Sequence, residues 1–118
     1  MKTIISVNPL KAGKLKEYKA FSAENTGHRK REYADLLHRY GLRNTKVYYH
    51  RLGDREFIIV MHDAEDDVKE RLAHFASSKN PYDQWFNEQL KKLHDFDGEP
   101  FAQLLFEFDP KKANLDVH

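Results

Sequence analysis

The chain of 118 residues contains no cysteine. This absence excludes a disulfide framework and a thiol nucleophile. Long apolar runs are also missing, because no stretch approaches the roughly 20 residues that a membrane-spanning helix requires. The apolar piece near the N-terminus, Thr3–Val7, is too short for the core of a signal peptide. These absences predict a soluble cytoplasmic protein.

An excess of charge of either sign is absent as well. Charged residues make up 33% of the chain, yet the net charge is only +1 with the histidines neutral. Nucleic-acid and membrane-surface proteins usually carry a basic patch. The basic cluster His28–Arg31 is short and is balanced by Glu32 and Asp35, as is typical of a solvated helix face. We therefore expect neither a nucleic-acid partner nor a membrane partner.

The common motifs for phosphate binding and nucleophilic catalysis are missing. There is no glycine-rich phosphate loop and no nucleophile elbow. Seven histidines are present, but no two have the spacing of metal ligands on one helix. Four of them recur every twelve residues, on four different predicted elements: His38, His50, His62 and His74. The sequence thus predicts no metal and no cofactor, assigns no catalytic residue, and leaves open whether the protein is an enzyme.

What the chain does contain is one strongly apolar stretch, Arg55–Asp63. Its centre, Phe57–Met61, is apolar at consecutive positions, which is typical of a strand buried on both faces. We expect this strand to be central in its sheet. Shorter β-branched or alternating runs predict further strands at Thr3–Asn8 and Phe101–Phe108.

A hairpin is predicted immediately before the central strand. Asn44–Leu52 has the composition of a strand, and Gly53-Asp54 fits a two-residue turn with glycine first. This turn places Arg51 opposite Glu56, an opposite-charge pair that supports the register. The same register pairs Tyr49 with Ile58, Val47 with Val60, Thr45 with His62, His50 with Phe57, Tyr48 with Ile59, and Lys46 with Met61.

Two helical regions separate these strands. Apolar residues at spacings of three and four predict an amphipathic helix over 14–40 that ends at Gly41. Gly27 lies inside it and should kink or break it. Asp63 is a plausible N-cap for the second region, which breaks and restarts at Asn80-Pro81 with asparagine as cap and proline first.

The order of elements is strand, helix, strand, strand, helix in two pieces, strand. This is the ferredoxin-like βαββαβ pattern, an α+β fold with an antiparallel sheet and helices on one face. Residues 1–109 are predicted to form a single domain, and residues 110–118 a frayed C-terminal tail.

The two faces of the predicted sheet differ in polarity. The face toward the helices is expected to carry Ile5, Val7, Ile58, Val60, Leu104 and Phe106. The opposite face would carry Ile4, Ser6, Asn8, Tyr48, His50, Phe57, Ile59, Met61, Gln103, Leu105 and Glu107. This second set is too apolar for open water, and such a patch usually marks an interface. The simplest cover is a second copy packed sheet on sheet, so we predict a homodimer through the sheet face.

Several short segments between Thr3 and Asp109 are similar to those of a known group of proteins. They are Lys16-Glu17-Tyr18, the passage Gly41…Asn44…Tyr48, Trp85-Phe86 and Glu107-Phe108. Together with the order of elements, they resemble the dimeric α/β-barrel superfamily, and within it an uncharacterised family close to the sugar mutarotases, L-rhamnose mutarotase in particular.

The resemblance implies positions for a ligand site. In the mutarotases a tyrosine, a histidine one helical turn later, and a tryptophan pair line the sugar pocket. Tyr18 and Trp85 match the tyrosine and one tryptophan, and Phe86 replaces the other. Counted forward from Tyr18, the place of the histidine is taken by Ser22. Counted back from Gly41, it falls near Thr26. Mutarotation requires a general acid and a general base. The hydroxyl groups of Ser22 and Thr26 do not transfer protons near neutral pH as an imidazole does, so the resemblance does not extend to mutarotase activity.

The predicted ligand-binding residues are Tyr18, Ser22, Tyr49, His62, Trp85 and Phe86. Tyr18 and Trp85 either line a pocket between the first helix and the sheet or are ordinary core aromatics. His62, at a strand end beside Tyr49, either faces a ligand or is satisfied by the backbone or by Asp63.

The opposite sheet face carries a second polar group. It consists of His50, Glu107, Tyr48, Ser6 and Asn8, and it forms either a site between subunits or a wet interface.

Three functions remain open. The first is a small dimeric α/β-barrel protein that binds a small polar ligand. The second is a mutarotase-like enzyme that acts at the anomeric carbon of a sugar. The third is a non-catalytic interaction module or stress-associated module.

Overall fold

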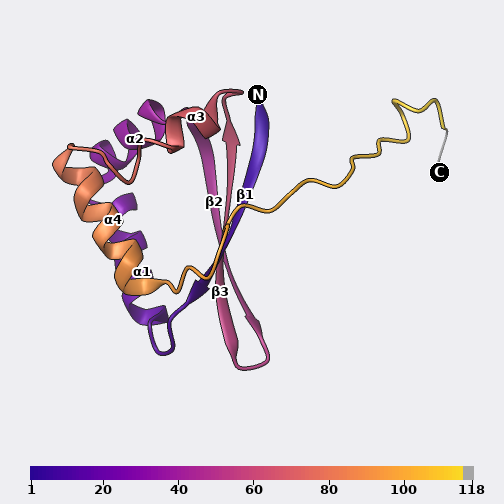
Figure 1. Cartoon of the computed structure of the whole chain (residues 1–118). Coiled ribbons are helices and arrows are strands. Elements are labelled where there is room, and N and C mark those ends of the chain that lie inside the picture. The colour runs from indigo at the N-terminus through magenta and orange to yellow at the C-terminus, as the bar shows by residue number, and fades with distance from the viewer. Residues whose placement is uncertain (116–118) are drawn as a thin grey trace.

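The computed structural model describes residues 1–115, so the last three residues of the predicted tail lie outside the described part. An antiparallel sheet has the strand order β1-β3-β2, with bounds β1 (Lys2–Leu10), β2 (Leu42–Leu52) and β3 (Arg55–Ala64). The helices are α1 (Leu15–Thr26), α2 (Lys30–Arg39), α3 (Val68–Leu72) and α4 (Pro81–Leu93). All four lie on one side of the sheet (Figure 1). No helix within residues 1–115 is long and apolar enough to cross a membrane.

The central strand and the hairpin agree with the sequence. β3 is the middle strand, as its apolar run predicted. Arg51 pairs with Glu56, and the other pairs predicted from Lys46 to His50 are also present. Nearer the start of β2 the register shifts, because Asn44 has a positive φ of 48° in a bulge. Two residues there, Asn44 and Thr45, oppose the single residue His62 of β3, as in a β-bulge.

The faces of β1 are the reverse of the prediction. β1 pairs with β3 so that Ser6 lies opposite Val60 and Asn8 opposite Ile58. The even-numbered residues therefore face the helices, and Ile5 and Val7 face the open side. A shift of one residue exchanges the two faces of a strand. The physical reason is that the Asn8 amide donates to Ser6 Oγ and to the Ile58 carbonyl, both at 3.0 Å, so these polar groups are satisfied when buried.

The predicted break in the first helical region is confirmed at Gly27. α1 ends at Thr26 and α2 begins at Lys30. A Cβ atom on Gly27 would lie 2.6 Å from the carbonyl oxygen of Ala23, a distance at which atoms overlap. The break therefore needs a residue without a side chain.

The caps of the later helices are partly as predicted. Asn80 caps α4 and accepts from the Tyr82 backbone N–H at 2.9 Å, with Pro81 in the first helical position. Asp63 is not an N-cap, because β3 continues to Ala64 and α3 starts only at Val68. The Asp63 carboxylate instead accepts from the Asn44 amide at 3.1 Å, next to the bulge.

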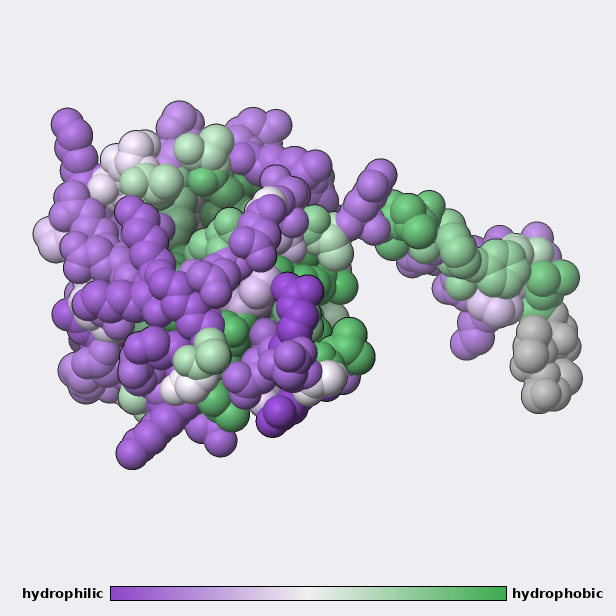
Figure 2. All heavy atoms as spheres, turned by 60° about the horizontal axis from the view of Figure 1, so that its bottom comes forward, coloured by the Kyte–Doolittle hydropathy of each residue, from purple (hydrophilic) through white to green (hydrophobic). Residues whose placement is uncertain are grey.

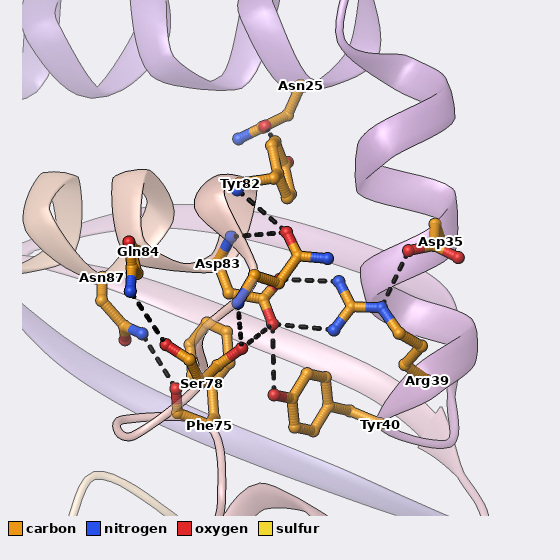
Figure 3. A network of polar contacts seen from close by, with 11 residues as sticks. Asn25, Asp35, Arg39, Tyr40, Phe75, Ser78, Tyr82, Asp83, Gln84 and Asn87 are labelled. Carbon is orange, nitrogen blue, oxygen red and sulfur yellow. Dashed lines mark hydrogen bonds and ion pairs between the residues drawn. The ribbon is translucent and has the colours of Figure 1, made fainter.

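A buried ion pair joins α4 to α2 (Figure 3). Asp83 has no exposed side-chain surface, and both its oxygens accept from Arg39 at 2.7 Å. Ser78 Oγ and Tyr40 Oη also donate to it, at 2.6 Å and 3.2 Å. Burial alone would raise the pKa of Asp83, but the Arg39 and Ser78 hydrogen bonds lower it below its usual value. This network fixes the start of α4 against the end of α2.

The buried core is divided into two clusters. One consists of Leu36, Tyr40, Leu42, Ala64, Val68 and Tyr82. The other consists of Leu10, Tyr18, Phe21, Ile58 and Leu93. Trp85 and Phe86 of α4 pack against both clusters. The division matters because the space between the clusters is hollow, as described below.

The strand predicted at Phe101–Phe108 does not join the sheet of this protomer. Only Phe101 bridges to Ser6, and the chain then leaves the body on the side away from the helices (Figure 1). Figure 2 shows apolar side chains along this protruding segment. Beyond it, residues 110–115 form a turn, in which Leu115 N–H donates to the Pro110 carbonyl at 2.8 Å. The complete βαββαβ pattern is therefore not formed within one chain.

Candidate functional site

A cavity of about 480 Å³ lies between the helices and the sheet. Residues of both core clusters line it, including Tyr18 and Phe21 from one and Leu36, Tyr40 and Leu42 from the other. Its volume falls within the roughly 300–1,000 Å³ of small-molecule sites. The interiors of folded domains contain few voids larger than a water molecule. The cavity is therefore a built feature of the fold and not a packing defect.

The wall of the cavity carries no formal charge. Among the described residues that line it there is no aspartate, glutamate, lysine or arginine. Eight phenylalanines and tyrosines line it: Tyr18, Phe21, Tyr33, Tyr40, Phe75, Phe86, Phe96 and Phe101. Its polar groups come from Ser6, Asn8, Ser22, Asn25, Thr26, Thr45, His62 and His94. Such a wall suits a neutral molecule that is mainly aromatic or apolar and carries a few hydrogen-bonding groups.

His94 is held in one tautomer by the backbone. It follows α4 directly, is buried, and places Nδ1 3.1 Å from the Pro9 carbonyl oxygen. A carbonyl only accepts, so Nδ1 carries the proton and Nε2 presents a lone pair in the neutral ring. Burial lowers the pKa of His94, with the Pro9 hydrogen bond partly opposing it and Lys11 adding to it. His94 is thus a neutral acceptor at neutral pH.

His62 lies at the β2–β3 bulge. Its Nδ1 atom is 2.9 Å from the Thr45 hydroxyl. Burial lowers the pKa of His62 to about 4, because desolvation disfavours the charged imidazolium. Burial likewise raises the pKa of the nearby Tyr33, and the Thr45 hydroxyl partly offsets the effect. The bulge therefore gathers three neutral hydrogen-bonding side chains on the cavity wall.

The α1 side of the cavity is also neutral and polar in places. Burial raises the pKa of Tyr18 to about 12, with the neighbouring Tyr33 adding to the effect and Ser22 opposing it. The Tyr18 ring meets the His94 ring edge to face, with centroids 5.7 Å apart. Asn25, a helical turn beyond Ser22, is buried and accepts the Tyr82 hydroxyl proton at its Oδ1 atom (Figure 3). Its amide nitrogen stays available as a donor, since no described residue accepts from it.

Four of the six predicted ligand residues come together in the cavity wall: Tyr18, Ser22, His62 and Phe86. Tyr49 and Trp85 do not line it. The Tyr49 hydroxyl donates to Glu56 at 2.7 Å on an exposed part of β2. Trp85 packs instead under the Arg29 guanidinium, 4.1 Å from its ring centroid. Whether the four lining residues bind a ligand stays a prediction.

The fold divides the polar group that the sequence suggests for a site between subunits. Ser6 and Asn8 line the cavity on the helix side. Tyr48 and His50 lie on the other face of β2, opposite Ile59 and Phe57. Glu107 belongs to the protruding segment. The reversal of the β1 faces and the exit of the C-terminal segment are the causes, so these five residues do not form one site within the described chain.

Sequence reasoning missed His94, Asn25 and Tyr33 as members of the wall. A signal for Asn25 was present, because it follows Tyr18 and Ser22 on the same side of the helix. A polar residue in an otherwise buried stripe often faces a cavity or a partner, since burial without a hydrogen bond is costly. His94 carried no such signal, because its position depends on the exit of the chain from α4 against Pro9.

The described residues contain no group of three or more histidine, cysteine, aspartate or glutamate side chains placed to hold a metal ion. The polar side chains of the cavity wall are imidazole, phenol, hydroxyl and amide groups.

Comparison with solved structures shows what fold this is. The tetracenomycin F2 cyclase of Streptomyces glaucescens, a type-II polyketide cyclase, matches with a TM-score of 0.56 and 20% sequence identity, over 92% of this chain and 98% of that chain. That protein has the dimeric α+β barrel fold of the ferredoxin-like group, so the likeness shows the fold. No protein-family model matches the sequence. The comparison with curated proteins gives no match.

Proposed function

We propose that this protein binds a neutral, largely aromatic small molecule in the cavity between its helices and its sheet. The observation that carries the proposal is the uncharged wall, which combines eight aromatic rings with a few fixed hydrogen-bonding groups. Aromatic side chains offer large flat surfaces to a ring system. The sequence suggested a small polar ligand, and the composition of the wall favours a more apolar one.

The polar groups would set the orientation of the ligand. His94 Nε2 is an acceptor because its Nδ1 proton is held by Pro9. The Asn25 amide nitrogen is a donor on the neighbouring helix. Tyr18, with its raised pKa, stays a neutral hydroxyl. A ligand with ring hydroxyl or carbonyl groups meets both kinds of partner, and a charged ligand would have to be desolvated without a counter-ion.

An enzymatic role is the second candidate, and His94 is the observation that favours it. Its Nε2 atom is the acceptor nitrogen of the neutral ring, and that ring meets the Tyr18 ring edge to face, so an imidazole that can act as a general base and a phenol that can act as a proton donor are neighbours in the wall. The structural likeness to a polyketide cyclase makes neutral polyketide-like phenols the natural substrate class to test. The cyclase activity itself does not follow from a likeness of fold.

The mutarotase alternative receives less support from the cavity. A sugar presents hydroxyl groups on every side and needs many hydrogen-bonding partners, whereas most of this wall is apolar. Trp85, which the resemblance placed in the sugar pocket, packs against Arg29 instead. A non-catalytic module without a ligand would leave the cavity without a role.

The test is a binding experiment with three probes. They are a dihydroxyanthraquinone, the same ring system bearing a carboxylate, and a set of monosaccharides, each titrated against the protein by calorimetry and by NMR chemical shifts. We expect the neutral anthraquinone to bind with shifts at Tyr18, Asn25 and His94, the carboxylate to bind at least tenfold more weakly, and the sugars not to bind. Saturation transfer between sugar anomers should equal that of buffer.

Two variants on one helix make the result specific to the cavity. Ser22→Phe places a large ring into the cavity wall, whereas Ala23→Phe places the same ring on the exposed side of α1. The first should abolish binding of the anthraquinone and the second should leave it unchanged. Equal binding by both variants, or binding of sugars alone, would contradict the proposed function.

A further inference from the structure

The side-chain amide of Asn25 is fixed at one end and has no protein partner at the other. Asn25 is buried, lines the cavity, and accepts the Tyr82 hydroxyl proton at its Oδ1 atom (Figure 3). No described residue accepts from its Nδ2 atom. Buried polar groups in folded proteins almost always have a hydrogen-bond partner, so a buried amide nitrogen without one needs an explanation.

The Tyr82 hydroxyl determines which end of this amide is free. Burial is the largest of the effects that raise the pKa of Tyr82, so the side chain stays a neutral donor. The Arg29 guanidinium lies over its ring, 5.5 Å from the centroid, and helps to hold the ring in place. A hydroxyl that donates to Oδ1 leaves Nδ2 as the free atom, and an amide nitrogen only donates. Asn25 therefore presents a donor to the cavity.

His94 presents the opposite kind of atom. Its Nδ1 proton faces the Pro9 carbonyl, so its Nε2 atom is an acceptor, and no described residue donates to it. His94 is 4% exposed and also lines the cavity. Among the described residues, only Arg29 Nη1 is a fully enclosed side-chain nitrogen or oxygen without a partner. The free atoms of Asn25 and His94 are therefore not fully enclosed, and the cavity is the space that both side chains border.

A continuous row of rings joins these two polar ends. Neighbouring ring centroids lie between 5.0 Å and 6.0 Å apart along the series His94, Tyr18, Phe21, Phe86 and Tyr82. The first four of these line the cavity. Tyr18, beside His94, precedes Asn25 by seven residues on α1, and such a spacing spans about 10 Å along a helix. A flat ring system can therefore lie along the row with one polar group at each end.

We propose that the molecule bound in this cavity is a flat hydroxyaryl ketone held in one orientation, with its hydroxyl group donating to His94 Nε2 and its carbonyl oxygen accepting from Asn25 Nδ2. This inference rests on the proposed function and adds the polarity of the ligand to it. A ketone oxygen suits the Asn25 end because it only accepts. The reverse orientation would set the ketone oxygen against the lone pair of His94. Tyr82 does not contact the ligand and is a positioning residue that fixes the Asn25 amide.

Ordered water is the alternative partner for both free atoms. A water molecule donates and accepts equally well, so a cavity whose polar atoms are satisfied by water does not distinguish the two ends of a ligand. An oriented site does distinguish them, because a ligand that lacks one group leaves a buried polar atom unpaired. The two cases therefore differ in how affinity responds to the removal of a single polar group from the ligand.

Three naphthalene probes of similar size measure this response on the wild-type chain. One is an acetylnaphthol with its hydroxyl and acetyl groups at opposite ends of the ring system, the second is its methyl ether, which lacks the donor, and the third is the corresponding ethylnaphthol, which lacks the acceptor. Each is titrated by fluorescence and by calorimetry. We expect the acetylnaphthol to bind about fivefold or more tightly than either of the others. Equal affinities for the three would overturn the orientation and leave the neutral aromatic site standing, whereas no binding by any of them would remove the proposed function as well.

A matched pair of variants tests the role of Tyr82. Tyr82→Phe keeps the ring but removes the hydroxyl, so the Asn25 amide can turn over and present its oxygen. Tyr49→Phe makes the same change at an exposed hydroxyl that bonds to Glu56 outside the cavity. The acetylnaphthol should bind Tyr82→Phe about fivefold more weakly than the wild type, and the ethylnaphthol, which forms no bond with Asn25, should bind both equally.

Tyr49→Phe should change neither affinity. An equal loss for the two probes in Tyr82→Phe would contradict the positioning role, because a general disturbance of the fold affects both. The probe series on the wild-type chain decides the orientation of the ligand independently of the stability of either variant.

Discussion

Mild acid should destabilise this protein through His62. Its imidazole is half-buried at the β2–β3 bulge, with a pKa of about 4 in the folded state, against about 6.5 in an unfolded chain. Between these values the unfolded state binds more protons than the folded state, so stability falls as the pH is lowered. The contribution is complete above pH 6.5 and is lost as the pH approaches 4.

The size of the effect follows from the two pKa values. Each pH unit between them changes the free energy of unfolding by up to about 1.4 kcal/mol. Over the whole interval the loss approaches about 3 kcal/mol, which is a large part of the roughly 5–15 kcal/mol that stabilises a typical domain. The side chain is only partly exposed, so the solvent discount on this figure is modest.

The assay is urea unfolding at a series of pH values, at one fixed protein concentration because the chain is predicted to dimerise. The matched variant is His62→Gln, whose amide reaches toward the Thr45 hydroxyl but does not titrate. Subtracting the two stability curves removes the contributions of His94 and Asp83, which both chains share. The wild-type curve should fall more steeply between about pH 6.5 and about pH 4. Parallel curves, or an NMR titration that places the His62 pKa near its usual value, would refute the reasoning.

Three further changes test the packing. Asp83→Ala should lower the free energy of unfolding by about 3 kcal/mol, because it leaves the Arg39 guanidinium without its buried partner. Urea unfolding measures this change. A loss below about 1 kcal/mol would make the pair no stronger than a surface ion pair. Gly27→Ala should destabilise the chain although alanine favours helices, because the added Cβ meets the Ala23 carbonyl. Thermal unfolding shows whether the variant is less stable than the wild type. A more stable variant would show that the backbone between α1 and α2 shifts to accept the methyl group. Asn80→Ala should cost about 1 kcal/mol through loss of the α4 cap, whereas Asn80→Asp should cost little.

The elements that the sequence predicted well are those specified by local pattern. The register of the β2–β3 hairpin follows from a two-residue turn, which fixes the pairs from Lys46 to Leu52, up to the bulge. The break at Gly27 and the Asn80 cap are likewise local. Each of these features involves residues within a few positions of one another, so their chemistry is visible along the chain.

The features that the sequence did not predict depend on distant partners. Ser6 and Asn8 look like residues of a wet face, but they face the helices, with Asn8 buried and Ser6 half-buried, and Asn8 bonds to Ser6 and to β3. The run 101–108 has the composition of a strand, but apart from the Phe101 bridge it forms no strand in the described sheet. Composition does not say which edge a strand joins. For the site, Tyr49 and Trp85 share a strand or a helix with cavity residues, which is why the sequence included them. In the structure Tyr49 bonds to Glu56 and Trp85 packs against Arg29, so both side chains lie outside the cavity.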